Sequence, residues 1–225
     1  MKTLINVILD ESGSMQNKCA DVIGGFNRFL EDQRQGDDEC RLSLVTFNTN
    51  HTVVHAAVPI ASALAMTAAS YVPGGSTALF DAVAQSVRLA DKDKQSDERV
   101  ICLIITDGEE NSSRETTKDQ VRKIIEEREG RGDWTFTYLG ISPERWAEQG
   151  VVTSAGNAAA YNAAAPQASF AAMSNAMRSM RVSASARTSN FYHDDLNPSK
   201  TTLARAIVTP LQAPVDADPW KRPHR

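Results

Sequence analysis

The sequence lacks the features that mark several classes of protein. It has only three cysteines, Cys19, Cys40 and Cys102, which are widely spaced and form neither a CxxC pair nor a Cys/His cluster. An odd, scattered set of this kind indicates neither a disulfide framework nor a zinc site. No stretch reaches the roughly 20 apolar residues that a membrane-spanning helix needs. Asp10 also interrupts the apolar N-terminal segment too early for a secretion signal.

The sequence also lacks a large excess of positive or negative charge. The formal net charge of the 225 residues is −4, without the basic stripe that nucleic-acid-binding proteins usually carry. We therefore expect neither nucleic acid nor a membrane as a partner. With unpaired cysteines and no export signal, the expected location is the reducing cytoplasm.

The sequence does contain the alternating strand-like and helix-like segments that are typical of an α/β domain, and 41% of its residues are hydrophobic. The expected order is strand 3–9, helix 17–34, strand 41–47, strand 52–58, a short helical piece, helix 78–91, strand 99–106, helix 115–129 and strand 134–139. The two strands joined by turn residues 48–50 should pair antiparallel. The others are separated by helices and should be parallel, with right-handed crossovers. The predicted fold is a Rossmann-like, doubly wound, mostly parallel sheet of about six strands, with one antiparallel strand and helices on both faces.

The pattern weakens after residue 140. We expect a short helix over 143–149, a short strand over 151–153 and an alanine-rich stretch over 156–166. Apolar residues then recur at helical spacing and predict a closing helix packed on the sheet: Phe170, Met173, Met177 and Met180. The domain is predicted to cover residues 1–182.

Residues 183–225 are predicted to form an extended or disordered tail. This segment has five prolines and scattered charges of both signs, and its hydrophobic pattern stops. Phe191, Tyr192 and Trp220 are its only large aromatic side chains, and they offer a way to anchor it on the domain.

A short motif follows the first strand. Asp10, Ser12 and Ser14 stand at alternate positions on a loop between that strand and the first helix. Open α/β sheets bind ligands at such carboxyl ends of strands. One carboxylate with two hydroxyls is a hard, all-oxygen set that suits Mg²⁺ or Mn²⁺ better than zinc.

Two later segments make this motif more specific. Thr77 ends a glycine-containing loop before a helix, and Asp107 follows the apolar strand that runs from Val100. Asp10, Ser12 and Ser14, then Thr77, then Asp107, resemble the metal-ion-dependent adhesion site (MIDAS) of von Willebrand factor type A (vWA) domains. All five positions carry the family's residue types. The resemblance runs from about residue 4 to about residue 181 and is strongest to bacterial or phage cytoplasmic single-domain members.

The resemblance implies how the metal is held. In the family, hydroxyls at the positions of Ser12 and Ser14 bind the metal directly. The threonine at Thr77 and the aspartates at Asp10 and Asp107 bind it directly or through water. Mg²⁺ prefers six oxygens in octahedral geometry. This set leaves a position that a Glu or Asp of a protein partner can fill.

Each residue also has an ordinary structural interpretation. Ser12, Ser14 or Thr77 can cap a helix, and Asp107 with the glycine after it can form a plain turn. Glu109 and Glu110 add negative charge beside the site, and solvated loop carboxylates are the simpler interpretation of both.

The leading functional hypothesis is a non-enzymatic, Mg²⁺-dependent protein-binding module, such as an adaptor or assembly factor. A metal-dependent phosphohydrolase of the haloacid dehalogenase kind is the enzymatic alternative. That family has Asp-x-Asp, with the second Asp as acid/base, and Ser12 cannot perform that role. By analogy with cytoplasmic relatives, an AAA+ ATPase of the MoxR type is a candidate partner, and a stress-response role like that of tellurite-resistance proteins is a further alternative.

Overall fold

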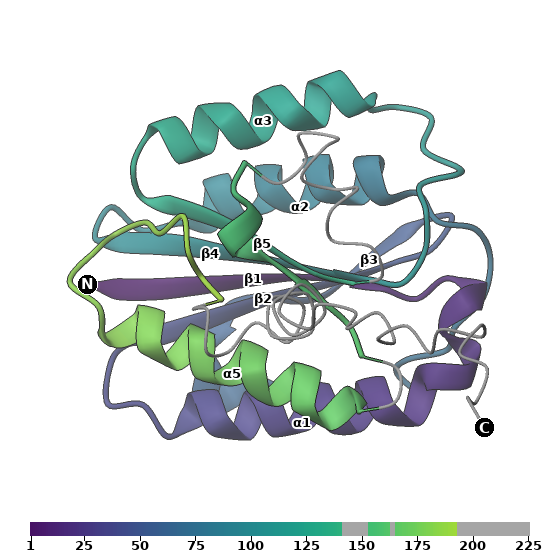
Figure 1. Ribbon diagram of the computed structural model, residues 1–225, viewed down its shortest axis with the longest axis horizontal. Coiled ribbons are helices and arrows are strands. Elements are labelled where there is room, and N and C mark those ends of the chain that lie inside the picture. Colours follow the sequence, from purple (N-terminus) through teal and green to yellow (C-terminus); the bar gives the residue numbers. More distant parts are fainter. Residues whose placement is uncertain (141–152, 163–164, 193–225) are drawn as a thin grey trace, which may run out of the picture.

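The computed structural model describes residues 1–140, 153–162 and 165–192. Its centre is a six-stranded sheet in the order β3-β2-β1-β4-β5-β6 (Figure 1). The strands are β1 (Lys2–Asp10), β2 (Cys40–Phe47), β3 (His51–Pro59), β4 (Glu98–Thr106), β5 (Trp134–Gly140) and β6 (Ala158–Ala160). Only the pairing of β3 with β2 is antiparallel. The predicted fold class is confirmed.

Helices cover both faces of the sheet. They are α1 (Cys19–Arg34), α2 (Leu79–Asp93), α3 (Lys118–Gly130) and α5 (Pro166–Val182). Figure 1 shows α1 and α5 on one face and α2 and α3 on the other. Two hydrophobic cores follow from this layering: Phe26 and Met173 belong to one, and Val83 and Trp134 to the other. The methionines of α5 are therefore core residues, as their spacing predicts. Within the described residues, no helix has the length and apolar character needed to cross a bilayer.

The central pair of strands, β1 and β4, positions the candidate site. Both are almost entirely buried, because helices cover each face. They run parallel, with Leu4 opposite Val100 and Leu9 opposite Ile105. Their carboxyl ends therefore lie side by side, and the loops that begin at Asp10 and Thr106 leave the sheet at the same edge.

Some element boundaries differ from the prediction. The chain after Ser12 first forms a 3₁₀ turn, Gly13–Lys18, before α1 begins at Cys19. Helix α3 begins at Lys118, because Thr117 caps it and forms a capping box with Gln120.

The predicted strand over 151–153 is wrong at Thr153, which lies in a bend, and residues 151–152 lie outside the described part. The sixth strand is Ala158–Ala160 instead, paired with Tyr138–Gly140. Strand preference reflects how side chains fit a packed surface. Ala158 and Ala159 are buried here, so small side chains suffice. The predicted helix over 143–149 also lies outside the described residues.

The start of the predicted tail packs on the domain. Phe191 and Tyr192 are buried, and their rings meet edge to face with centroids 5.0 Å apart. The Tyr192 N–H donates to the Gly156 carbonyl over 2.9 Å. Within the described residues, contacts with the domain thus continue to Tyr192, beyond the boundary predicted at 182. Residues 193–225, including Trp220, lie outside the described part.

Candidate metal centre

Asp10 is the last residue of β1, and its carboxylate is fully buried. The Ser12 N–H donates to Asp10 Oδ1 over 2.7 Å, and Thr106 Oγ1 donates to Oδ2 over 2.5 Å. The Tyr71 hydroxyl donates to the Asp10 carbonyl over 2.6 Å. Ser12 and Thr106 thus fix the orientation of the carboxylate, and Tyr71 holds the backbone of Asp10. The sequence offers no signal for Tyr71, and the only signal for Thr106 is its place next to the motif residue Asp107.

Burial raises the pKa of Asp10 above its ordinary value of 3.8. Hydrogen bonds from Thr106 and Ser12 oppose this effect, and the negative charge of Asp107 adds to it. A buried carboxylate beside another carboxylate is electrostatically costly, and a nearby cation relieves that cost.

Ser12, Ser14 and Asp107 form one connected chain of oxygens. Ser12 Oγ lies 3.0 Å from Ser14 Oγ, and Ser14 Oγ donates to Asp107 Oδ1 over 2.7 Å. The other carboxylate oxygen, Oδ2, forms an ion pair with the ammonium of Lys18. Sequence reasoning missed Lys18, because a lysine at the end of a turn carries no motif of its own.

Thr77 reaches the same place from a third segment. A Cβ built on Gly108 would lie 3.1 Å from Thr77 Oγ1, and 3.5 Å from both Asp10 Oδ2 and Ser14 Oγ. Oxygens from two distant segments, residues 10–14 and Thr77, therefore converge on a point beside Gly108, which belongs to a third segment. Since Ser12 and Asp107 contact Ser14 directly, the structure brings all five predicted residues together.

Backbone contacts hold the Thr77 loop against the first loop. The Gly13 N–H donates to the Gly75 carbonyl over 3.1 Å, and the Gly74 N–H donates to the Glu11 carbonyl over 2.9 Å. Gly75 has φ of +74°, a conformation that favours glycine. Gly74 does not share this conformation, so of the two glycines only Gly75 requires this conformational freedom.

The geometry does not support helix capping as the role of Ser12 or Thr77. Ser12 precedes the 3₁₀ turn, but its side chain makes no capping hydrogen bond. Thr77 is not the residue that caps α2, since that position belongs to Ala78. The side chains of both residues instead contribute oxygens to the cluster.

The acidic residues beside the site differ in their hydrogen bonds and exposure. Glu110 accepts hydrogen bonds from the N–H groups of Phe80 and Ser113, at 3.0 and 2.7 Å, and so ties its loop to the start of α2. The prediction of a solvated carboxylate is therefore wrong for Glu110, whereas Glu109 is exposed. Glu11 accepts from the Val72 N–H over 2.5 Å and has a structural contact of its own.

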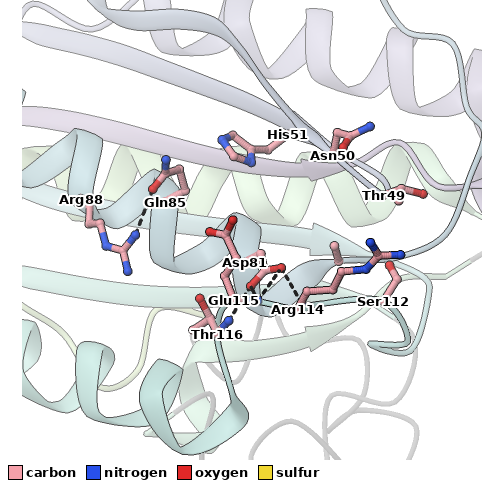
Figure 2. A pocket seen from close by; sticks show the side chains of 11 residues that line it. Thr49, Asn50, His51, Asp81, Gln85, Arg88, Ser112, Arg114, Glu115 and Thr116 are labelled. Carbon is pink, nitrogen blue, oxygen red and sulfur yellow. Dashed lines mark hydrogen bonds between the residues drawn. The ribbon is translucent and has the colours of Figure 1, made fainter.

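A cavity of about 350 Å³ adjoins the Thr77 loop. Its walls come from the β2–β3 turn, the start of α2 and the loop between β4 and α3 (Figure 2). The Asp81 carboxylate accepts from the N–H groups of Arg114 and Thr116, at 2.8 and 2.7 Å, and so shapes the third wall. Figure 2 shows Arg88 and Arg114 on either side of Asp81. Among the described residues, neither arginine forms an ion pair, and Arg88 Nη1 donates to Gln85 Oε1 over 3.2 Å.

The sequence matches the model of the von Willebrand factor type A domain over residues 5–191. The chain belongs to this family. No curated protein matches the sequence.

Solved structures agree on the fold of this vWA domain. The vWF domain of the type V pili tip protein Mfa5 from Porphyromonas gingivalis has a TM-score of 0.61 at 11% identity, over 81% of this chain and 96% of that one. Manganese-loaded Plasmodium vivax TRAP protein has a TM-score of 0.54 at 16% identity, over 76% and 72%. Proximal thread matrix protein 1 from the mussel byssus, with a zinc-occupied MIDAS motif, has 0.55 at 16%, over 76% and 46%. The chain thus spans less than half of the mussel protein.

The residues of this vWA domain fit a hard divalent cation. Within residues 1–140, 153–162 and 165–192, no three His, Cys, Asp or Glu side chains form a cluster that could hold a metal ion. A cation here therefore depends on the three hydroxyls as well as on Asp10 and Asp107. Neutral hydroxyl and carboxylate oxygens are the ligands that Mg²⁺ and Mn²⁺ accept.

Proposed function

We propose that this vWA domain is a non-enzymatic module that binds a protein partner through a divalent cation, Mg²⁺ or Mn²⁺. Ser12, Ser14 and Thr77 would hold the cation, with Asp10 and Asp107 in support. The observation that carries this proposal is the convergence of Thr77 Oγ1, Asp10 Oδ2 and Ser14 Oγ around Gly108. When bound, the cation supplies a positive charge to which an outside carboxylate can bind.

The burial of the ligands supports an open site rather than a closed one. Asp10 and Ser12 are buried, whereas Ser14 is exposed, so one side of the cluster faces solvent. Both oxygens of Asp10 and both of Asp107 already accept hydrogen bonds or ion pairs from this chain. The negative charge of each carboxylate is therefore already partly compensated by these donors. A cation held this way stays electron-poor and attracts a Glu or Asp of the partner.

The surroundings of the site also suit a protein partner. The cavity beside Thr77 is lined mainly by polar residues, and Arg88 and Arg114 are among them. A partner segment with a carboxylate at the metal would pass over this cavity, where the two arginines can pair with further acidic groups. We propose an adaptor or assembly role in the cytoplasm, and an AAA+ ATPase of the MoxR type is one candidate partner.

The phosphohydrolase alternative gains no support from the site. That chemistry needs an acid/base two residues after the nucleophilic aspartate. Ser12 occupies the position and contacts Ser14, and the Glu11 carboxylate accepts from the Val72 N–H. Nothing near Asp10 among the described residues replaces the second carboxylate except Asp107, whose oxygens bind Ser14 and Lys18.

Metal binding is tested by calorimetry with Mg²⁺ and Mn²⁺. The wild-type protein should bind one ion, and Asp10→Ala should abolish binding while circular dichroism shows an intact fold. Asp37→Ala is the matched control, because Asp37 is exposed and lies beyond the C-terminal end of α1, whereas Asp10 precedes that helix. Equal affinity of the wild type and Asp10→Ala would refute the site.

Partner binding is tested by affinity capture with and without EDTA. Chelation should release the partner without unfolding the domain. Thr77→Ala should weaken capture with little loss of thermal stability, because the hydrogen bonds of Thr77 to Asn111 involve backbone groups of Thr77. Thr52→Ala, an exposed threonine on β3, is the control. A complex that survives EDTA would show that the cation does not bridge the two proteins.

A further inference from the structure

Lys18 places a positive charge inside the candidate metal centre. It ends the 3₁₀ turn that carries Ser14, and its ammonium forms an ion pair with Asp107 Oδ2. The Asp107 side chain is 3% exposed and that of Lys18 is 21% exposed. The carboxylate is thus fixed in the interior, whereas the lysine approaches it from the surface and can turn back to solvent.

The ion pair changes the charge of the whole centre. With Asp10 and Asp107 ionised and Lys18 protonated, the three groups sum to about −1, and without Lys18 they sum to about −2. A divalent cation brings these totals to about +1 and 0 respectively. Lys18 therefore acts in opposite directions on the two binding steps. It repels the metal, and it makes the metal-loaded centre attractive to an anion.

We propose that Lys18 is a built-in counter-cation that keeps the centre weakly loaded until an acidic partner arrives. This inference rests on the proposed metal-dependent function. In the metal-free protein, Lys18 neutralises Asp107. On loading, the metal competes with Lys18 for that carboxylate. The partner's carboxylate then binds a centre of net positive charge, so metal and partner bind cooperatively. Lys18 is a positioning and charge-setting residue, not a metal ligand.

A merely structural role for the ion pair predicts something different. If Lys18 only fastened the start of α1, its removal would lower stability equally with and without metal. If Lys18 is a counter-cation, bound metal should instead supply the positive charge that Lys18 supplied. The metal-free variant should lose stability, because Asp107 is buried beside Asp10 without a positive neighbour. Saturating Mg²⁺ should restore most of that loss.

The test uses the full chain and Mg²⁺ alone as the probe. Lys18→Met keeps the length of the side chain and removes its charge, Lys18→Arg keeps the charge, and Lys123→Met removes a charge from an exposed position on α3. Calorimetry at constant pH and ionic strength should show Mg²⁺ binding at least about tenfold tighter in Lys18→Met. Lys18→Arg and Lys123→Met should stay within about threefold of wild type.

A second measurement tests the opposite effect on an anion. The probe is N-acetylglutamate amide, which carries one side-chain carboxylate, titrated into Mg²⁺-saturated protein and followed by amide NMR signals of the metal loops. Wild type and Lys18→Arg should show weak saturable binding, and Lys18→Met should bind at least about threefold more weakly. Equal affinity for the probe in the wild type and Lys18→Met would overturn the cooperative part of the proposal.

The outcomes separate this inference from the proposed function. If Lys18→Met and wild type bind Mg²⁺ equally while Asp10→Ala does not bind, the role of Lys18 is refuted and the metal-dependent function stands. If Lys18→Met binds Mg²⁺ and wild type does so only weakly, the inference is supported. If neither binds Mg²⁺ or Mn²⁺, both proposals fail.

Discussion

Two adjacent glycines in α1 should respond in opposite ways to the same substitution. A Cβ built on Gly25 would lie 2.2 Å from Cδ2 and 2.5 Å from Cγ of Phe170 on α5. A Cβ built on Gly24 meets nothing within 4 Å. The contact at Gly25 is therefore a close approach of two helices on one face of the sheet (Figure 1).

The expected magnitudes follow from these distances. In a helix interior, glycine costs about 0.5–1 kcal/mol relative to alanine, so Gly24→Ala should stabilise the domain by that amount. Gly25→Ala gains the same preference but must displace the Phe170 ring, which is 2% exposed and stands edge-on to Tyr161. Overpacking of this kind costs about 1–3 kcal/mol and outweighs the gain when no atom can move away.

The assay is urea unfolding followed by circular dichroism. The two variants should differ in free energy of unfolding by about 2 kcal/mol, with unchanged m-values. In a domain of this size, that difference corresponds to roughly 4–8 °C in Tm. A Gly25→Ala variant as stable as Gly24→Ala would refute the close packing of α1 on α5. A changed m-value would instead point to an altered native or denatured state.

Two further predictions concern buried charges. Arg99 is fully buried and donates to Thr3 Oγ1 and to the carbonyls of Arg181 and Ser185. Arg99→Met should therefore lower the free energy of unfolding in urea by at least about 2 kcal/mol and expose the end of α5 to limited proteolysis. Unchanged stability would contradict this anchoring role. Burial alone would raise the pKa of Glu98, but hydrogen bonds from Arg41 and from the Gln95 N–H lower it below 4.5. The stabilisation from Glu98 is therefore present above the pKa of the unfolded state and is lost as the pH falls through the pKa of the folded state. The difference in Tm between wild type and Glu98→Gln should shrink from pH 6 to pH 3. A constant difference would refute this role of Glu98.

The fold class and the candidate ligands could be read from the sequence, because both depend on local pattern. Buried parallel strands appear as apolar runs and amphipathic helices as a 3.6-residue period. Asp10, Ser12 and Ser14 mark the end of the first such strand, and Asp107 marks the end of another. Since ligand sites in open parallel sheets lie at strand ends, a set of oxygen ligands at those positions already predicted a shared site.

Other features depend on which distant segments come into contact, and local pattern does not contain that information. The register of β1 against β4 places Thr106 where its hydroxyl can donate to Asp10. The 3₁₀ turn that contains Ser14 also carries Lys18 to Asp107, 89 residues away in sequence. The short strand Ala158–Ala160 forms because β5 offers an edge that small side chains can pack against, although alanine shows no strand preference of its own. The charge of the metal centre, and with it the proposed balance between metal and partner, was thus decided only when the tertiary structure brought Lys18 beside Asp107.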